Sequence, residues 1–137
     1  LFIKKEKTIE RTLLAEGITG DTTVGHTTAF CQTLESLGNV NLDGNTKIER
    51  AIALELERIA VHVGDLSAMC TDVAYQLGSA GFGALRTPII NFTQSWCGNR
   101  FGKGLIRTGG SYFPLTNTLA DKLKNVLKDF EWRFEEI

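Results

Sequence analysis

Apolar residues recur at alternating intervals of four and three along the middle of the chain, and this seam constrains the fold most. Its members are Ile48, Ile52, Leu56, Ile59, Val63, Leu66, Cys70, Val73 and Leu77. Such spacing places side chains along one face of an α-helix. Residues 46–49, Thr-Lys-Ile-Glu, form a capping box, in which hydroxyl and carboxylate satisfy free backbone N–H groups. The sequence therefore predicts one continuous helix over 46–77, central in its bundle.

Shorter helical patterns flank the seam. A weak pattern over 8–14 favours a short helix or a strand, and Asp21 or Thr22 can begin a helix that stops at Gly38. A further helix is expected over 82–96, started or kinked by Pro88, and a last one from about residue 117 onward. Residues 98–114 are rich in glycine and predicted to be irregular. Together these patterns predict an all-α fold, an antiparallel bundle of about four helices.

Composition narrows the classes of protein. A chain of 137 residues with 42% hydrophobic and 23% charged residues can bury one ordinary core, so 1–137 is expected to form a single helical domain. A net charge of −1 with scattered basic residues argues against nucleic-acid binding. No apolar run approaches the roughly 18–20 residues of a transmembrane helix. Three cysteines without a CxxC pair argue against zinc or disulfides and fit a reducing cytoplasm.

The ends of the sequence suggest a piece of something longer. The chain lacks an initiator methionine, and its last residues continue a helical pattern. We therefore expect a fragment of a larger chain whose bundle has lost part of its cover. Exposed apolar patches beyond a few hundred Å² tend to be buried by association, so we expect the fragment to self-associate or to bind a partner.

A polar row runs along the central helix between its apolar rows. It consists of Glu55, Arg58, His62, Asp65, Met69, Asp72 and Gln76. Unpaired buried charges would cost several kcal/mol each, so any buried members must find partners. Asp65 follows His62 by one turn, and we expect it to hydrogen bond a shielded His62. A solvated face or a structural ion-pair network is the competing interpretation. The candidate catalytic residues are His62, Asp65, Arg58 and His26.

Three segments in order then resemble a known superfamily. They are Glu57, Arg58, Ile59, His62 and Asp65; Gly98, Asn99 and Arg100; and Arg107, Thr108, Gly109 and Gly110. The pattern resembles the large subunit of energy-converting nickel–iron hydrogenases of formate hydrogenlyase type and the homologous 49-kDa component, or D subunit, of respiratory complex I. Thr108 stands where the family has Pro, and Ser111 where it has Val. The resemblance covers about residue 14 to the C-terminus.

The segment from Glu16 to His26 departs from the hydrogenase pattern. In that family two cysteines of the matching loop bind the nickel–iron centre, and here Thr19 and Thr22 take their places. Threonine hydroxyls are hard, weakly acidic ligands, whereas nickel and low-spin iron require soft thiolates. The family's second cysteine pair lies beyond this segment. We expect no metal site and no cofactor in the fragment, which alone should be inactive.

The resemblance implies a component of a membrane-associated oxidoreductase that uses NAD and quinone, on the cytoplasmic face of the membrane. Implied partners are an iron–sulfur small subunit, which would hold the clusters, and membrane subunits. Arg100 and Arg107 become the candidate cofactor-binding residues. Loss of the cysteines favours the complex I branch, whereas the sequences of 24–35 and 64–78 more closely resemble the hydrogenase branch. Both a quinone and a nickel–iron centre therefore stay open for the parent complex. The alternative is a non-catalytic scaffold bundle; a His62–Asp65–Arg100 network would favour the redox role and solvated charges the scaffold.

Overall fold

The computed structural model describes residues 7–137, which form an all-α bundle with one short hairpin, as predicted. The elements are α1 (Thr8–Ala15), α2 (Thr23–Leu37), α3 (Gly44–Asp72), α4 (Gln76–Cys97), β1 (Ile106–Arg107), β2 (Gly110–Ser111) and α5 (Asn117–Glu135). Within the Gly-rich segment, β1 and β2 pair antiparallel. None of the helices in residues 7–137 is long and apolar enough to cross a membrane.

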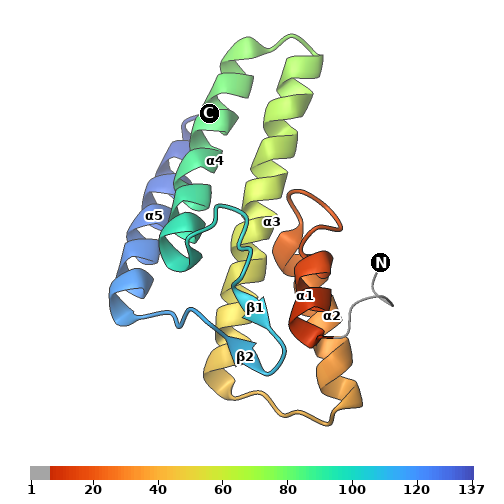
Figure 1. Ribbon diagram of the computed structural model, residues 1–137. Helices are drawn as coiled ribbons and strands as arrows, with labels where there is room; N and C mark the ends of the chain where they lie inside the picture. The colour runs from red at the N-terminus through yellow and green to blue at the C-terminus, as the bar shows by residue number, and fades with distance from the viewer. Residues whose placement is uncertain (1–6) are drawn as a thin grey trace.

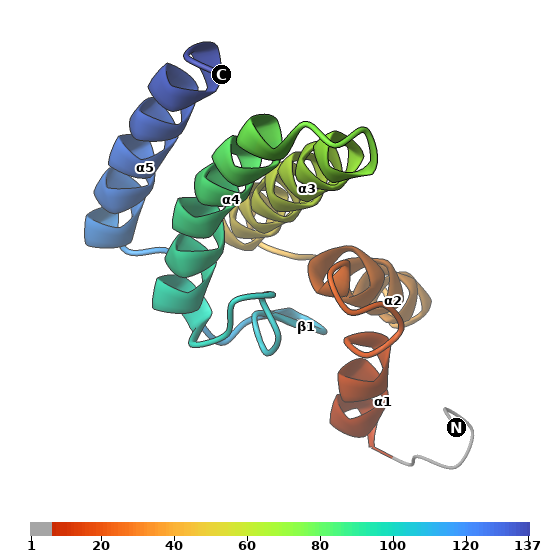
Figure 2. The ribbon, with the colours of Figure 1, turned by 90° about the horizontal axis from the view of Figure 1, so that it is seen from above.

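The helices α3 and α4 form a long antiparallel hairpin at the centre of the molecule (Figure 1). Seen from above, α5 covers the outer side of α4, while α2 and then α1 lie on the other side of α3 (Figure 2). The core between these layers contains Val24, Cys31, Ala53, Leu56, Ala60, Ile89, Phe92, Trp96, Cys97, Leu105, Ile106 and Leu123. On α5, Trp132 stays 62% exposed and Phe134 45% exposed, and self-association remains a prediction.

Helix α3 is continuous through Gly64 as predicted, but both of its ends differ from the expectation. It begins at Gly44, because the Asp43 carboxylate accepts the Thr46 N–H at 2.8 Å and so caps the helix itself. The capping-box prediction, with its helix start at Thr46, is therefore wrong. The helix ends at Asp72 rather than Leu77, where Ala74 adopts a left-handed φ of 60° and the chain turns into α4.

The buried face of α3 shares Leu56 and Val63 with the predicted seam but otherwise follows a neighbouring row. Arg50, Ala53, Leu56, Ala60 and Val63 are buried, whereas Ile48 is 59% exposed. Ile52 and Ile59 are only half-buried, and Ala53 and Ala60 take the buried positions beside them. Because protein interiors are close-packed, the fit against neighbouring helices decides which row is buried.

The other helices follow their patterns more closely. The segment around α1 is a helix and not a strand, and α2 ends at Gly38 as expected. Helix α4 starts at Gln76, six residues before the prediction, and runs through Pro88, so that proline does not begin it. Gly98 ends α4 with a left-handed φ of 77°, a conformation that favours glycine. Thr116 caps α5 by accepting the Leu119 N–H at 3.3 Å.

Candidate functional site

A buried ion pair joins α2, α3 and the hairpin. Arg50 donates from Nη1 to Glu35 Oε2 at 2.9 Å and from Nη2 to Oε1 at 2.7 Å. The same Nη2 donates to the Arg107 carbonyl at 2.8 Å, and the Gly109 N–H donates to Glu35 at 2.7 Å. Burial pushes the pKa of Glu35 upward, but the hydrogen bonds from Arg50 and Gly109 outweigh it and hold that pKa below its ordinary value. Glu35 is therefore a charged group whose two carboxylate oxygens both accept hydrogen bonds inside the fold, so its role is structural.

A second buried pair fastens the Gly-rich segment to the end of α1. Arg107 donates to Glu16, which also accepts the Gly104 N–H at 2.8 Å. Both side chains are buried, as are Leu105 and Ile106 between them and the core. Arg107, a candidate cofactor-binding residue, thus donates from Nη1 to two internal acceptors, Glu16 and the Ile106 carbonyl. The segment acts as a fixed support for the neighbouring site.

The loop between α1 and α2 carries the two threonines that replace the family's cysteines. Thr19 Oγ1 lies 3.1 Å from Nε2 of His26, one of the candidate catalytic residues. Thr22 precedes α2 but makes no side-chain capping bond there. Within residues 7–137, no three His, Cys, Asp or Glu side chains gather in a group that could hold a metal ion.

A groove of about 390 Å³ opens beside this loop. Its lining residues are Thr22, Leu54, Glu55, Glu57, Arg58, Val61 and His62. Two of the candidate catalytic residues, Arg58 and His62, therefore meet Thr22 in one place. Arg58 also forms an ion pair with Glu55, and both side chains are largely exposed, so the pair itself adds little stability.

The prediction that His62 is shielded and bonded to Asp65 is wrong. Both residues are exposed, and within the described part of the chain neither makes a hydrogen bond or ion pair. His62 follows Ala53 by nine residues and Asp65 follows Leu56 by nine. Nine steps of about 100° turn a side chain to the opposite side of a helix. Burial of Ala53 and Leu56 thus places His62 and Asp65 on the outer face, and no His62–Asp65–Arg100 network forms.

Glu57 connects the groove with a second, more enclosed cavity. Its carboxylate accepts the Val24 N–H at 2.6 Å and the Gly25 N–H at 2.9 Å, so it caps α2 from the neighbouring helix. Burial raises the pKa of Glu57, partly offset by these two hydrogen bonds. The charge of His26 lowers this pKa further and that of Asp21 raises it. Glu57 therefore has a higher proton affinity than an ordinary glutamate.

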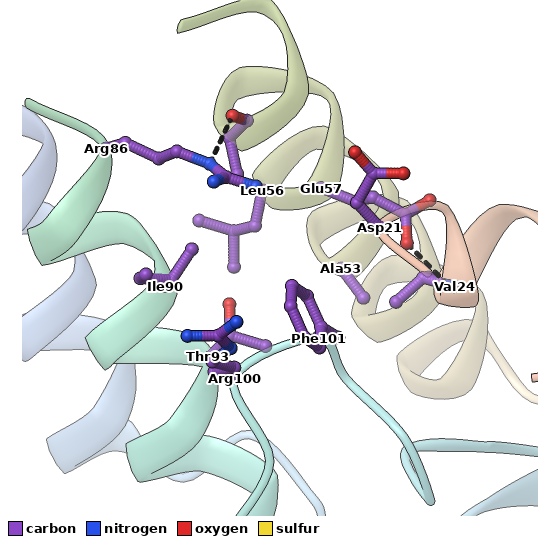
Figure 3. A pocket seen from close by; sticks show the side chains of 11 residues that line it. Asp21, Val24, Ala53, Leu56, Glu57, Arg86, Ile90, Thr93, Arg100 and Phe101 are labelled. Carbon is purple, nitrogen blue, oxygen red and sulfur yellow. Dashed lines mark hydrogen bonds between the residues drawn. The ribbon is translucent and has the colours of Figure 1, made fainter. Parts of the chain in front are cut away.

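The enclosed cavity lies between α3, α4, the α1–α2 loop and the start of the Gly-rich segment (Figure 3). The carboxylates of Asp21 and Glu57 lie on one side of it, and Arg86 and Arg100 on the other, with Phe101 between. Its volume of about 20 Å³ has room for about one water molecule. Arg86 Nε donates to the Ala60 carbonyl at 3.0 Å, and Arg100 stacks 4.4 Å from the Phe101 ring centre. The cavity is a small polar site and has no room for a ring-shaped ligand.

No protein-family model matches the chain. It is 28% identical over 107 residues to the D subunit of NADH-quinone oxidoreductase of Clostridium beijerinckii, covering 78% of this chain and 29% of that protein. It is 31% identical to the NADH-quinone oxidoreductase D 2 subunit of Sorangium cellulosum, over 75% of this chain and 26% of the relative. The D subunit of the Campylobacter jejuni enzyme is 27% identical, over 75% of this chain and 27% of the relative.

The chain is similar to the D subunit of NADH-quinone oxidoreductases. This finding supports the complex I side of the resemblance, while the hydrogenase side stays a prediction. The matched part spans only 26–29% of the length of these relatives. The activity and partners of a whole D subunit therefore enter below only as proposals.

The structure brings two of the candidate residues, Arg58 and His62, to one groove, but the sequence did not mark Arg50 as buried or Glu57 as a cap of α2. Arg50 lies three residues before the buried Ala53 and therefore on the same face of α3. A charged residue on a buried face needs a partner of opposite charge, and this is the signal that could have identified it. Glu57 gave no such signal, since its two partners are backbone N–H groups 32 and 33 residues away. Backbone partners leave no trace in side-chain patterns.

Proposed function

We propose that this chain is a component of a membrane-associated redox complex, related to the D subunit, and contributes its groove to a quinone-reaction and proton-handling region. The observation that carries the proposal is the meeting of Thr22, Glu57, Arg58 and His62 around one groove, in a chain similar to the D subunit. The proposed partners are an iron–sulfur small subunit and membrane subunits, with the chain peripheral on the cytoplasmic face.

The groove has the size and chemistry for a quinone head group. Its volume of about 390 Å³ lies within the roughly 300–1,000 Å³ of small-molecule sites. Leu54 and Val61 offer apolar contact to a ring, while Arg58 and His62 carry N–H donors for its carbonyl oxygens. An iron–sulfur cluster of the neighbouring subunit would supply electrons. The residues of this chain would bind and orient the quinone and handle protons.

A nickel–iron centre does not fit the corresponding loop. Thr19 and Thr22 offer hydroxyl oxygens where soft thiolates are needed. Thr19 is already in contact with His26, and Thr22 faces the groove. We therefore assign this loop to the wall of the quinone site and propose no metal chemistry through it.

A scaffold role is the second candidate, and the exposure of the polar row favours it. His62 and Asp65 are solvated, and the charges with the best geometry, Glu16, Glu35 and Arg50, hold the fold together. A bundle that only assembles partner subunits needs a stable fold held by such ion pairs and no reactive groups in the groove. The two functions differ in whether substitutions in the groove change electron transfer without changing assembly.

The test is purification of the native complex through a tag on the protein that contains this chain. Its subunits are identified by mass spectrometry, and reduction of a short-chain quinone is measured. We expect an iron–sulfur subunit to copurify, and His62→Ala and Arg58→Ala to lower quinone reduction at least tenfold in fully assembled complex. Lys124→Ala, in an exposed ion pair on α5, serves as the control. Normal quinone reduction by both groove variants would support the scaffold and contradict the redox role.

A further inference from the structure

We propose that Glu57 is the acid–base residue of the groove, giving a proton to and taking one from a quinone-class ligand bound there. The inference rests on the proposed function and adds a residue that was not among the candidate catalytic or cofactor-binding residues. Glu57 belongs to both the lining of the groove and the lining of the enclosed cavity. A carboxyl group in that position can exchange a proton with a ligand on one side and with a water-sized space on the other.

The geometry leaves Glu57 able to carry a proton. Each carboxylate oxygen accepts one backbone N–H, from Val24 and Gly25. Because a carboxylate has about four acceptor sites, two remain for a proton and a ligand. The two N–H groups also fix the carboxyl in position, which general acid–base catalysis requires before any matching of pKa.

The charges around Glu57 come from every element packed against it. Asp21 from the α1–α2 loop raises its pKa and His26 from α2 lowers it. Arg86 from α4 and Arg100 from the Gly-rich segment line the cavity side. Glu55, Arg58 and His62 line the groove side. Burial is the largest influence and raises the pKa, so the proton is held more tightly than on a solvated glutamate but is still exchangeable.

The proton balance of the reaction defines the role. Reduction of a quinone to a quinol adds two electrons and two protons. The electrons would come from the iron–sulfur donor of the proposed neighbouring subunit. One proton passes from the Glu57 carboxyl to a quinone oxygen, which leaves a carboxylate that is reprotonated from the cavity side. The second proton comes from solvent, since the groove is open.

A structural cap on α2 would place the same carboxyl in the same position, so the test must separate the two roles. Glu57→Gln keeps an oxygen acceptor for α2 but cannot exchange a proton. Glu57→Asp keeps the proton chemistry on a shorter side chain. Glu49→Gln is the matched control, because Glu49 also lies on α3 and also accepts a backbone N–H, from Leu115 at 2.7 Å, but lines neither space.

The experiment measures quinone reduction by the intact purified complex from pH 5 to 9, with assembly checked for each variant. Glu57→Gln is expected to lower the rate about 100-fold and to remove one ionisation from the pH profile. Glu57→Asp should retain that ionisation at a shifted pH, and Glu49→Gln should match the wild type. A Glu57→Gln complex with a rate within twofold of wild type and an unchanged pH profile overturns the inference alone. A wild-type complex that does not reduce quinone overturns the proposed function and this inference with it.

Discussion

Replacing Arg50 with methionine, which keeps an unbranched apolar stem but has no guanidinium, should destabilise the chain severely. Arg50 and Glu35 are 3% and 4% exposed, so the substitution leaves a buried carboxylate without its counter-charge. Removal of one partner from a buried ion pair costs about 3–5 kcal/mol. Domains of this size have about 5–15 kcal/mol of total stability, so the loss is a large share of it. We expect urea unfolding, followed by circular dichroism, to show a loss in that range.

The double variant Glu35→Leu with Arg50→Met tests the reason for that loss. Removing both charges abolishes the uncompensated carboxylate, so part of the stability should return. The recovery stays incomplete because the Gly109 N–H and the Arg107 carbonyl lose their partners, at about 1–3 kcal/mol each. Lys124→Met, which breaks an ion pair with both side chains 71% exposed, should cost less than about 1 kcal/mol. An Arg50→Met loss no larger than that of Lys124→Met would show that the buried pair does not stabilise the fold.

Three further predictions concern single groups. Gly102→Ala should lower the free energy of unfolding by at least about 1 kcal/mol more than Gly109→Ala, measured by thermal unfolding. Both glycines have a positive φ, but only at Gly102 would a Cβ lie 2.6 Å from a side-chain carbon of α2; equal losses of stability would contradict this. Because the pKa of Glu35 is lowered in the folded chain, its charged form stabilises the fold above the ordinary glutamate pKa of 4.5, and this stabilisation is lost as the pH falls through the lower folded value. The free energy of unfolding should therefore decline between pH 6 and 3, and Glu35→Gln should remove the part of that decline due to Glu35. An unchanged decline in the variant would argue against it. Burial raises the pKa of Cys31, so a thiol reagent should modify the half-buried Cys70 first in the native protein; faster reaction at Cys31 would show that α2 opens readily.

Most of the fold could be predicted from local patterns. The helices, the stop at Gly38 and the stop at Gly98 depend on periodicity and on backbone preferences near each position. The burial of Arg50, Ala53 and Ala60 on α3 could not be predicted, because it depends on how the helices pack and not on apolar spacing. The end of α3 was missed because Val73 continues the apolar spacing although it is 76% exposed in the turn.

The candidate site was predictable only in part. Arg58 and His62 lie one turn apart on one helix, so their meeting in the groove follows from spacing alone. The position of Thr22 beside them and the contact of Thr19 with His26 depend on the course of the loop. The capping of α2 by Glu57 depends on the packing of α2 against α3, which joins residues more than 30 positions apart.

Photoaffinity labelling tests most directly whether this groove is a quinone site. A short-chain quinone carrying a photoreactive group is illuminated with the intact complex, and labelled peptides are identified by mass spectrometry. We expect labelling within 54–62 and around Thr22, removed by an excess of unlabelled quinone and weakened by His62→Ala. Labelling of this chain only at the exposed aromatic residues of α5, or labelling of the groove that unlabelled quinone does not reduce, would contradict it.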